Sequence, residues 1–272
     1  MPGLRTFFVQ GVSILVALGF GSAQLYGQAV EKVLVETYAV TSGKINGEPP
    51  LITYRIYVDM APGYQLQMVY GDMHHQLVIR TSTDFFNDPE NDTRYGDRVS
   101  GDHLNSYPYA LDSWLTIARA SDRHVGVPRE LDTDGSILEC PPYADLGATT
   151  SKSEELPLKP LCIVDGLMKD TTNREVVNFN LPVSYMGGIR GGELETTNGA
   201  WALLGGMMGT TPENMVLIAQ LSTNGQLSFK LNLQIGTPDH EVLKYVSSDP
   251  MSGELVFEGL SFGAFRAPRA DR

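Results

Sequence analysis

Several sequence patterns that carry chemistry are missing from this chain. It has no H-E-x-x-H pattern, and its 5 histidines are scattered. The adjacent His74 and His75 would point to opposite faces of a strand and so would not bind one metal ion together. The glycine-rich residues 185–199 lack the G-K-[ST] ending of a phosphate loop, so we predict turns there. A glycan-active hydrolase, which needs only two carboxyl groups, is the lowest-ranked alternative.

Positive charge is also scarce. The chain has 20 Lys and Arg against 32 Asp and Glu, which gives a formal net charge of −12. Nucleic acids and anionic membrane surfaces are bound through clusters of Lys and Arg. The charge balance therefore argues against both partners and is typical of a soluble protein outside the cell.

No apolar run reaches the roughly 20 residues that a membrane-spanning helix needs. The first 29 residues have a cation at Arg5, an apolar run over residues 7–20 and small residues at Ala23 and Ala29. This is the pattern of a signal peptide. We predict a leader over residues 1–29 that is removed after Ala29 or Ala23. The chain is then secreted or lies at the cell surface, with the periplasm as the alternative, and has no stable membrane insertion after cleavage.

The 2 cysteines, Cys140 and Cys162, lie in a proline-rich segment. In an exported protein such a pair favours a disulfide, which would stabilise the fold by on the order of 3 kcal/mol. Two free buried thiols are the alternative.

Helical periodicity is rare after residue 33, whereas strand patterns are frequent. In "VLIAQLSTNGQLSFKLNLQIG", residues 216–236, two apolar runs flank Asn224-Gly225, which predicts a type I′ hairpin. Five apolar side chains from Leu227 to Ile235 alternate with polar ones. Residues 51–60 alternate in the same way, and the turn over residues 61–65 predicts a second hairpin. We predict an all-β antiparallel β-sandwich, jelly-roll or immunoglobulin-like, with long loops.

The strand pattern predicts one large domain over residues 30–265, followed by a tail over residues 266–272. Loop insertions are expected near residues 82–108 and 127–173. Long loops at the end of a sandwich often carry binding sites. Inert insertions are the alternative for each loop.

Acidic side chains in these loops are candidates for calcium binding. Asp132, Asp134 and Glu139 supply oxygen ligands, although Pro141 occupies the place where an EF-hand needs its bidentate glutamate. The earlier loop offers a second acidic set, which is Asp88, Glu90, Asp92 and Asp97. Solvated turn residues are the alternative for both sets.

Aromatic residues are the candidates for binding a glycan. Tyr107, Tyr109 and Trp114, if exposed, would let sugar rings stack on them beside a calcium-supported loop. The alternative for the only two tryptophans, Trp114 and Trp201, is to fill the space between the sheets.

Four blocks together resemble a known family. They are "YRIYVDMAPGYQLQMVYGD", "LDSWLTI", "TNGAW" and "VLIAQLSTNGQLSFKLNLQIGTP". The resemblance covers residues 34–120 and 196–246. The family consists of secreted β-rich domains in surface and extracellular proteins of the Bacteroidota, associated with type IX secretion. The resemblance implies an extracellular β-rich module.

We therefore expect a non-enzymatic exported surface-structural or adhesion module. Its partners would be copies of itself or a larger cell-surface complex, reached through free edge strands at residues 33–40 or 255–260. A calcium-supported carbohydrate-binding module is the alternative.

Overall fold

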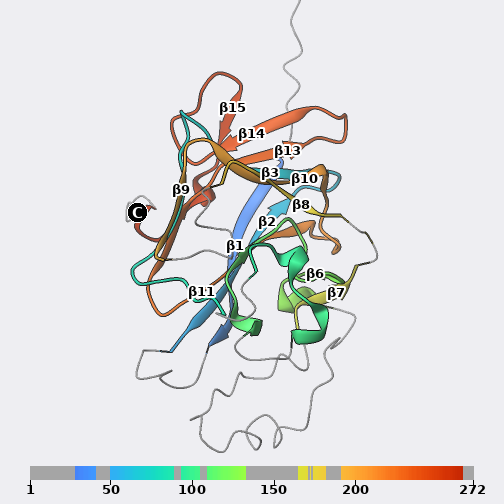
Figure 1. Ribbon diagram of the computed structural model, residues 1–272. Helices are drawn as coiled ribbons and strands as arrows, with labels where there is room; N and C mark the ends of the chain where they lie inside the picture. The colour runs from blue at the N-terminus through green and yellow to red at the C-terminus, as the bar shows by residue number, and fades with distance from the viewer. Residues whose placement is uncertain are drawn as a thin grey trace, which may run out of the picture.

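The chain folds into facing antiparallel sheets in the computed structural model (Figure 1). The structure describes residues 28–40, 50–88, 93–104, 109–132, 165–170, 172, 174–181 and 191–265. The predicted disulfide, the predicted C-terminal tail and the signal peptide up to residue 27 lie outside these ranges. None of the helices within them has the length and apolar composition needed to cross a bilayer.

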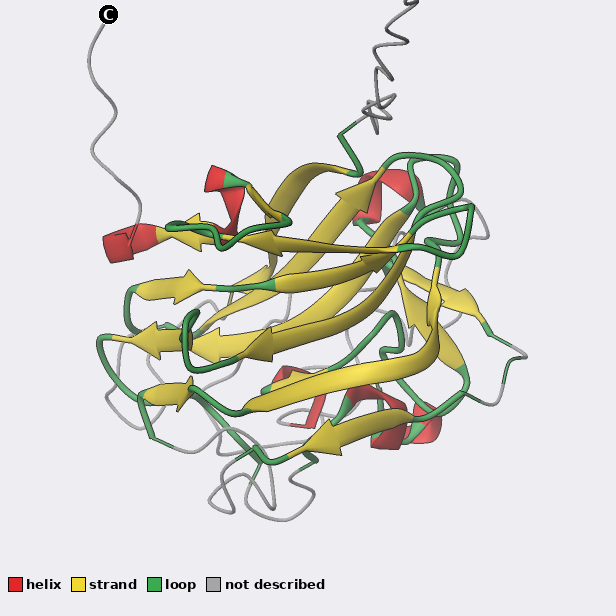
Figure 2. Ribbon diagram, turned by 90° about the horizontal axis from the view of Figure 1, so that it is seen from above, coloured by secondary structure: helices red, strands yellow, loops and turns green. Residues whose placement is uncertain are grey.

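Strands make up about half of the described chain, and the only helices in it are single turns (Figure 2). The strands are β1 (Val30–Val40), β2 (Ile52–Met60), β3 (Gln65–Gly71), β4 (Leu77–Thr81), β5 (Trp114–Leu115), β6 (His124–Gly126), β7 (Leu167–Lys169), β8 (Val176–Phe179), β9 (Glu193–Thr196), β10 (Gly199–Met207), β11 (Met215–Thr223), β12 (Leu227–Lys230), β13 (Leu233–Gly236), β14 (Val242–Val246), β15 (Glu254–Val256) and β16 (Ser261–Phe262). The 3-10 turns are η1 (Gly96–Arg98), η2 (Gly101–His103), η3 (Tyr109–Leu111), η4 (Arg129–Leu131), η6 (Glu258–Leu260) and η7 (Gly263–Phe265).

Three sheets form the sandwich. The central sheet has the order β1-β2-β11-β5, the six-stranded sheet has the order β15-β14-β13-β3-β10-β8, and a third sheet has the order β16-β12-β4-β9. The short pair β6-β7 stands apart from them. All pairings are antiparallel except that of β14 with β15. The predicted all-β sandwich is confirmed.

The main core lies between the central sheet and the other two. Ile56 and Val58 of β2 meet Trp201 of β10 and Phe229 of β12 there. Each of these side chains is fully buried. The alternation expected from Leu227 to Ile235 is confirmed, because all five apolar members belong to this core.

That alternating run is divided into β12 and β13 rather than forming one strand. Asn232 lies at the break and is buried, and its side-chain amide donates to the carbonyl oxygens of Tyr70 and His75, each at 3.0 Å. The same chain therefore pairs first with β4 and then with β3.

The prediction of a hairpin at Asn224-Gly225 is wrong. The flanking strands β11 and β12 belong to different sheets, so the turn is a corner of the sandwich. Gly225 does not have a positive φ. A Cβ at Gly225 would lie 2.5 Å from the hydroxyl oxygens of Thr81 and Thr83, so close approach accounts for the glycine. The hairpin expected at residues 61–65 is wrong for the same reason, because β2 and β3 lie in different sheets.

A second core covers the opposite face of the central sheet. Tyr57 of β2 and Leu217 of β11 point into it, where they meet Trp114, Tyr109 and other apolar side chains. Residues 93–104, 109–132 and 165–170 supply most of the covering side chains. These segments include described parts of both predicted loop insertions, and those parts pack against the sheet.

Candidate functional site

The structure buries two of the three aromatic residues expected to bind a glycan. Tyr109 is 5% exposed and Trp114 is 2% exposed, and both belong to the second core. Neither presents a face on which a sugar can stack, so that expectation is corrected, because both rings are packed inside the second core. Trp201 is fully buried in the main core and donates from Nε1 to the carbonyl of Thr116 at 2.9 Å. Tyr107 lies outside the described residues.

The described members of the calcium candidates have separate structural roles. Asp132 accepts a hydrogen bond from the amide of Gly166 at 2.9 Å, and Asp97 accepts one from the amide of Val176 at 3.2 Å. Asp88 is buried, and its amide donates to Asp112. In the part of the chain that the structure describes, no three metal-ligating side chains gather. Four further candidates, Asp134, Glu139, Glu90 and Asp92, lie outside the described residues, and calcium binding stays a prediction.

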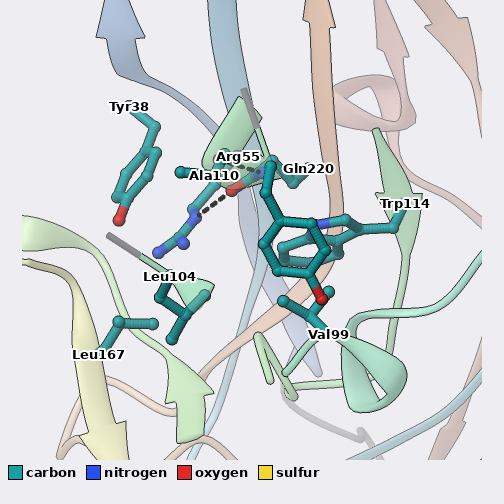
Figure 3. Close-up of a pocket in the computed structure, with 9 residues that line it drawn as sticks. Tyr38, Arg55, Val99, Leu104, Ala110, Trp114, Leu167 and Gln220 are labelled. Carbon is teal, nitrogen blue, oxygen red and sulfur yellow. Dashed lines mark hydrogen bonds between the residues drawn. The ribbon is translucent and has the colours of Figure 1, made fainter. Parts of the chain in front are cut away.

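Arg55 of β2 is the largest charged group inside the second core (Figure 3). It is 2% exposed, and its Nε donates to Gln220 Oε1 at 3.0 Å while Nη1 donates to the carbonyl of Gly166 at 3.1 Å. Its guanidinium carbon lies 3.5 Å from the centre of the Tyr38 ring, a cation–π contact. The amide of Gln220 then donates to the carbonyls of Ala110 and Asp112. Arg55 and Gln220 thus join the central sheet to the chain that covers it.

The cavity beside Arg55 is too small to be a ligand site. It has a volume of about 10 Å³, which is room for about one water molecule. Burial acts to lower the pKa of the Arg55 guanidinium, but Tyr38, Tyr57 and Glu36 outweigh it and raise the pKa. Burial raises the pKa of the Tyr38 and Tyr57 hydroxyls. The arginine therefore stays charged beside neutral phenols, which is a structural arrangement.

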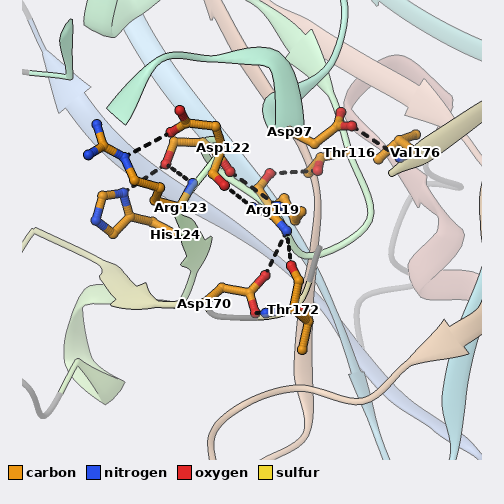
Figure 4. A network of polar contacts seen from close by, with 10 residues as sticks. Asp97, Thr116, Arg119, Asp122, Arg123, His124, Asp170, Thr172 and Val176 are labelled. Atoms are coloured by element: carbon orange, nitrogen blue, oxygen red, sulfur yellow. Dashed lines mark hydrogen bonds and ion pairs between the residues drawn. The ribbon is translucent and has the colours of Figure 1, made fainter. Parts of the chain in front are cut away.

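A second polar network surrounds Arg119 (Figure 4). Arg119 and Asp170 form a buried ion pair at 3.0 Å. Arg119 also donates to the carbonyls of Ser121, Asp122 and Thr172. These contacts hold the loop before β6 against the chain after β7, so the role of Arg119 is structural.

His124 lies at the edge of that network and is buried. Its Nδ1 hydrogen-bonds with Ser121 Oγ at 2.7 Å. Burial and the neighbouring charge of Arg123 lower the pKa of His124. The carboxyl group of Asp97 is also buried, and its own burial raises the pKa of Asp97.

The outer face of the six-stranded sheet carries an open groove of about 270 Å³. Ala200 of β10 is paired with Tyr70 of β3 on one side and with Phe179 of β8 on the other. A small side chain therefore lies between two aromatic ones in the same row, and this makes the hollow. Trp201 points the opposite way, into the core, so Ala200 faces out.

Polar side chains line the groove around this row. Asn180 and Asn198 are exposed near Phe179, while Gln234 and Lys244 lie on the far side of Tyr70. Gln234 Nε2 donates to Gln67 Oε1 at 2.9 Å, which fixes its amide. Asn180 has a φ of 47°, a left-handed conformation that asparagine tolerates.

One end of the groove is held in place by a buried hydrogen bond. His75 Nε2 lies 2.6 Å from Glu254 Oε2, and Asp72 Oδ1 accepts from the amides of His74 and His75. Lys244 Nζ lies 5.8 Å from the centre of the Tyr70 ring. Burial raises the pKa of Tyr70, with further contributions from Glu254 and Asp72, so its hydroxyl stays protonated.

Exposed apolar side chains are concentrated on the same sheet. Within the described ranges, the large ones are Val40, Met73, Phe179, Leu204, Met208, Val242, Met251, Leu255 and Val256. All except Val40 lie on the six-stranded sheet or in the connections next to its strands. Exposed apolar surface of this kind marks sites of contact with other molecules.

Comparison with known proteins adds no relative: no family model, no curated protein and no solved structure matches the chain.

The groove was missed by sequence reasoning because its residues come from five strands. Tyr70 and Phe179 are 109 positions apart, and no local spacing links them. The only available signal was the small-residue run "TNGA" at residues 197–200 beside a strand rich in apolar side chains.

Replacing Arg55 with lysine tests its role in joining the two layers. R55K loses the paired geometry of the guanidinium and its contact with Tyr38, so the free energy of unfolding should fall by about 3 kcal/mol. Urea unfolding measures this. R98K, at an arginine that is 57% exposed, is the matched control and should change the value by less than about 0.5 kcal/mol. Equal effects for the two variants would contradict the assigned role.

The lowered pKa of His124 predicts a pH dependence of stability. The unfolded chain binds the His124 proton at a pKa of about 6.5, and the folded chain binds it only at lower pH. The contribution to stability is therefore fully present above about pH 6.5 and is lost as the pH falls through the folded pKa. In melting curves between about pH 7 and 5, H124N should show a weaker loss of Tm than the parent. H74N, at an exposed histidine, serves as the control. An unchanged slope in H124N would show that another group is responsible.

Proposed function

We propose that this protein is a non-enzymatic exported module that works at the cell surface by contact, as a structural or adhesion protein assembling with copies of itself. The observation that carries the proposal is the concentration of exposed apolar side chains on the six-stranded sheet and its free edge. At that edge Leu255 and Val256 of β15 are 41% and 47% exposed.

Two unlike edges support assembly into chains of molecules. Among the described strands, β15 pairs only with β14, and β1 pairs only with β2. An unpaired strand edge presents N–H and C=O groups to another strand. When two different edges of one molecule pair between copies, the contact is head-to-tail and leads to open assemblies.

The signal-peptide pattern and the resemblance to secreted Bacteroidota domains support the surface location. The contacts of Ala29 favour the earlier cleavage position. Ala29 is fully buried, its amide donates to the Tyr245 hydroxyl at 2.9 Å, and its carbonyl accepts from Ala61 at 3.0 Å. Cleavage after Ala23 keeps these bonds, whereas cleavage after Ala29 removes them.

Charging the β15 edge tests the proposal. The purified exported chain should sediment faster as its concentration rises, and the double variant L255K/V256K should stay monomeric, because lysine on an edge blocks strand pairing. M73K is the matched control, since Met73 is 82% exposed and belongs to neither edge strand. A parent chain that sediments as a monomer at every concentration would contradict self-assembly.

A further inference from the structure

We propose that the groove on the six-stranded sheet is a binding site for a neutral, hydroxyl-rich oligosaccharide segment. The inference rests on the proposed function, since it names a ligand through which a surface module would adhere. It replaces the buried pair Tyr109 and Trp114 with a different set of residues.

The shape of the groove fits a ring that lies between aromatic walls. Strands in a sheet are about 4.8 Å apart, so the backbones that carry Phe179 and Tyr70 are roughly 10 Å apart, with Ala200 on the strand between them. Phe179 is 47% exposed and offers its ring to the groove. An aromatic wall packs against the C–H face of a sugar ring, and a shallow floor at Ala200 leaves space for it.

The polar groups of the groove suit hydroxyl groups. A sugar hydroxyl both donates and accepts hydrogen bonds, and the side-chain amides of Asn180, Asn198 and Gln234 offer a carbonyl oxygen and an NH₂ group each. The amide nitrogen of Gln234 donates to Gln67 Oε1 at 2.9 Å, which orients this side chain in the groove. Asn180 and Asn198 are exposed at the rim, where a ligand can reach them.

The charge of the lining favours a neutral ligand. Lys244 and Asp72 are the lining residues that carry a charge, and these two charges cancel. The Tyr70 hydroxyl is kept protonated by its burial and by Glu254 and Asp72. An acidic polysaccharide would be attracted by Lys244 but repelled by Asp72. The formal net charge of −12 on the whole chain would also repel it.

Recognition in the groove depends on side chains rather than on the backbone. β3, β10 and β13 each have a paired strand on both sides, so none of the three is an edge strand. An extended peptide that binds by adding a strand needs a free edge, which these strands do not offer. A ligand on this face must therefore be held by stacking and by side-chain hydrogen bonds.

Native gel electrophoresis through immobilised polysaccharides tests the site. The probes are laminarin, mannan, dextran and xylan as neutral polymers, and alginate and heparin as acidic ones. We expect at least one neutral polymer to retard the exported chain. F179A should weaken that binding about tenfold by removing the aromatic wall. A200L should abolish it by filling the floor. Phe179 is 47% exposed, so F179A should keep the melting temperature of the parent; Ala200 is 4% exposed, so the binding of A200L is compared only after a melting curve shows that this variant is folded.

L204A is the matched control, because Leu204 is 76% exposed on the same strand as Ala200 and does not line the groove. It should bind like the parent. The proposal is overturned if none of the four neutral polymers retards the chain, if acidic polymers alone do so, or if F179A and A200L bind like the parent. A monomeric chain that binds a neutral polymer through Phe179 would refute self-assembly through β15 and keep the glycan site.

Discussion

Burial of the central sheet on both faces determines how the rest of the chain is arranged. One face of β2 and β11 packs into the main core of the sandwich. The other face carries Tyr57 and Leu217, whose apolar surface is stabilised by burial away from water. The second face also carries Arg55 and Gln220, whose polar groups must be paired once they are buried. Residues 93–104, 109–132 and 165–170 meet both needs, because they bring apolar side chains to the sheet and carbonyl oxygens to those two residues.

This arrangement leaves one large sheet face for contact with other molecules. The described parts of the segments that look like surface loops in the sequence pack in the second core and in the networks around Arg55 and Arg119. On the outer face of the six-stranded sheet, Phe179, Leu204 and Val242 are exposed within the described part of the chain. Both the proposed assembly edge and the proposed glycan groove belong to that sheet. A single chain can therefore use the edge for copies of itself and the face for a ligand.

The sequence predicts the strands better than their partners. Alternation identifies the inward residues from Leu227 to Ile235 and in β2 because that pattern is local. The turn at Asn224-Gly225 has the composition of a hairpin, yet it crosses between sheets, because strand pairing depends on contacts far apart in the chain. The burial of Trp114 has the same origin, since its cover comes from segments that no periodicity links to it. The groove is the hardest feature to predict. It exists because Ala200 lies between Tyr70 and Phe179, which belong to two other strands.

Hydrogen exchange resolved by residue tests the double-sided burial of the central sheet most directly. The account predicts that amides of the covering chain, such as Val127 bonded to Gly166 and Gly126 bonded to Ala118, exchange as slowly as amides in β2 and β11. They should be released only with global unfolding, since the second core joins them to the sheet. Rapid exchange of these amides while β2 and β11 stay protected would contradict the account, because the covering chain would then be an independent loop.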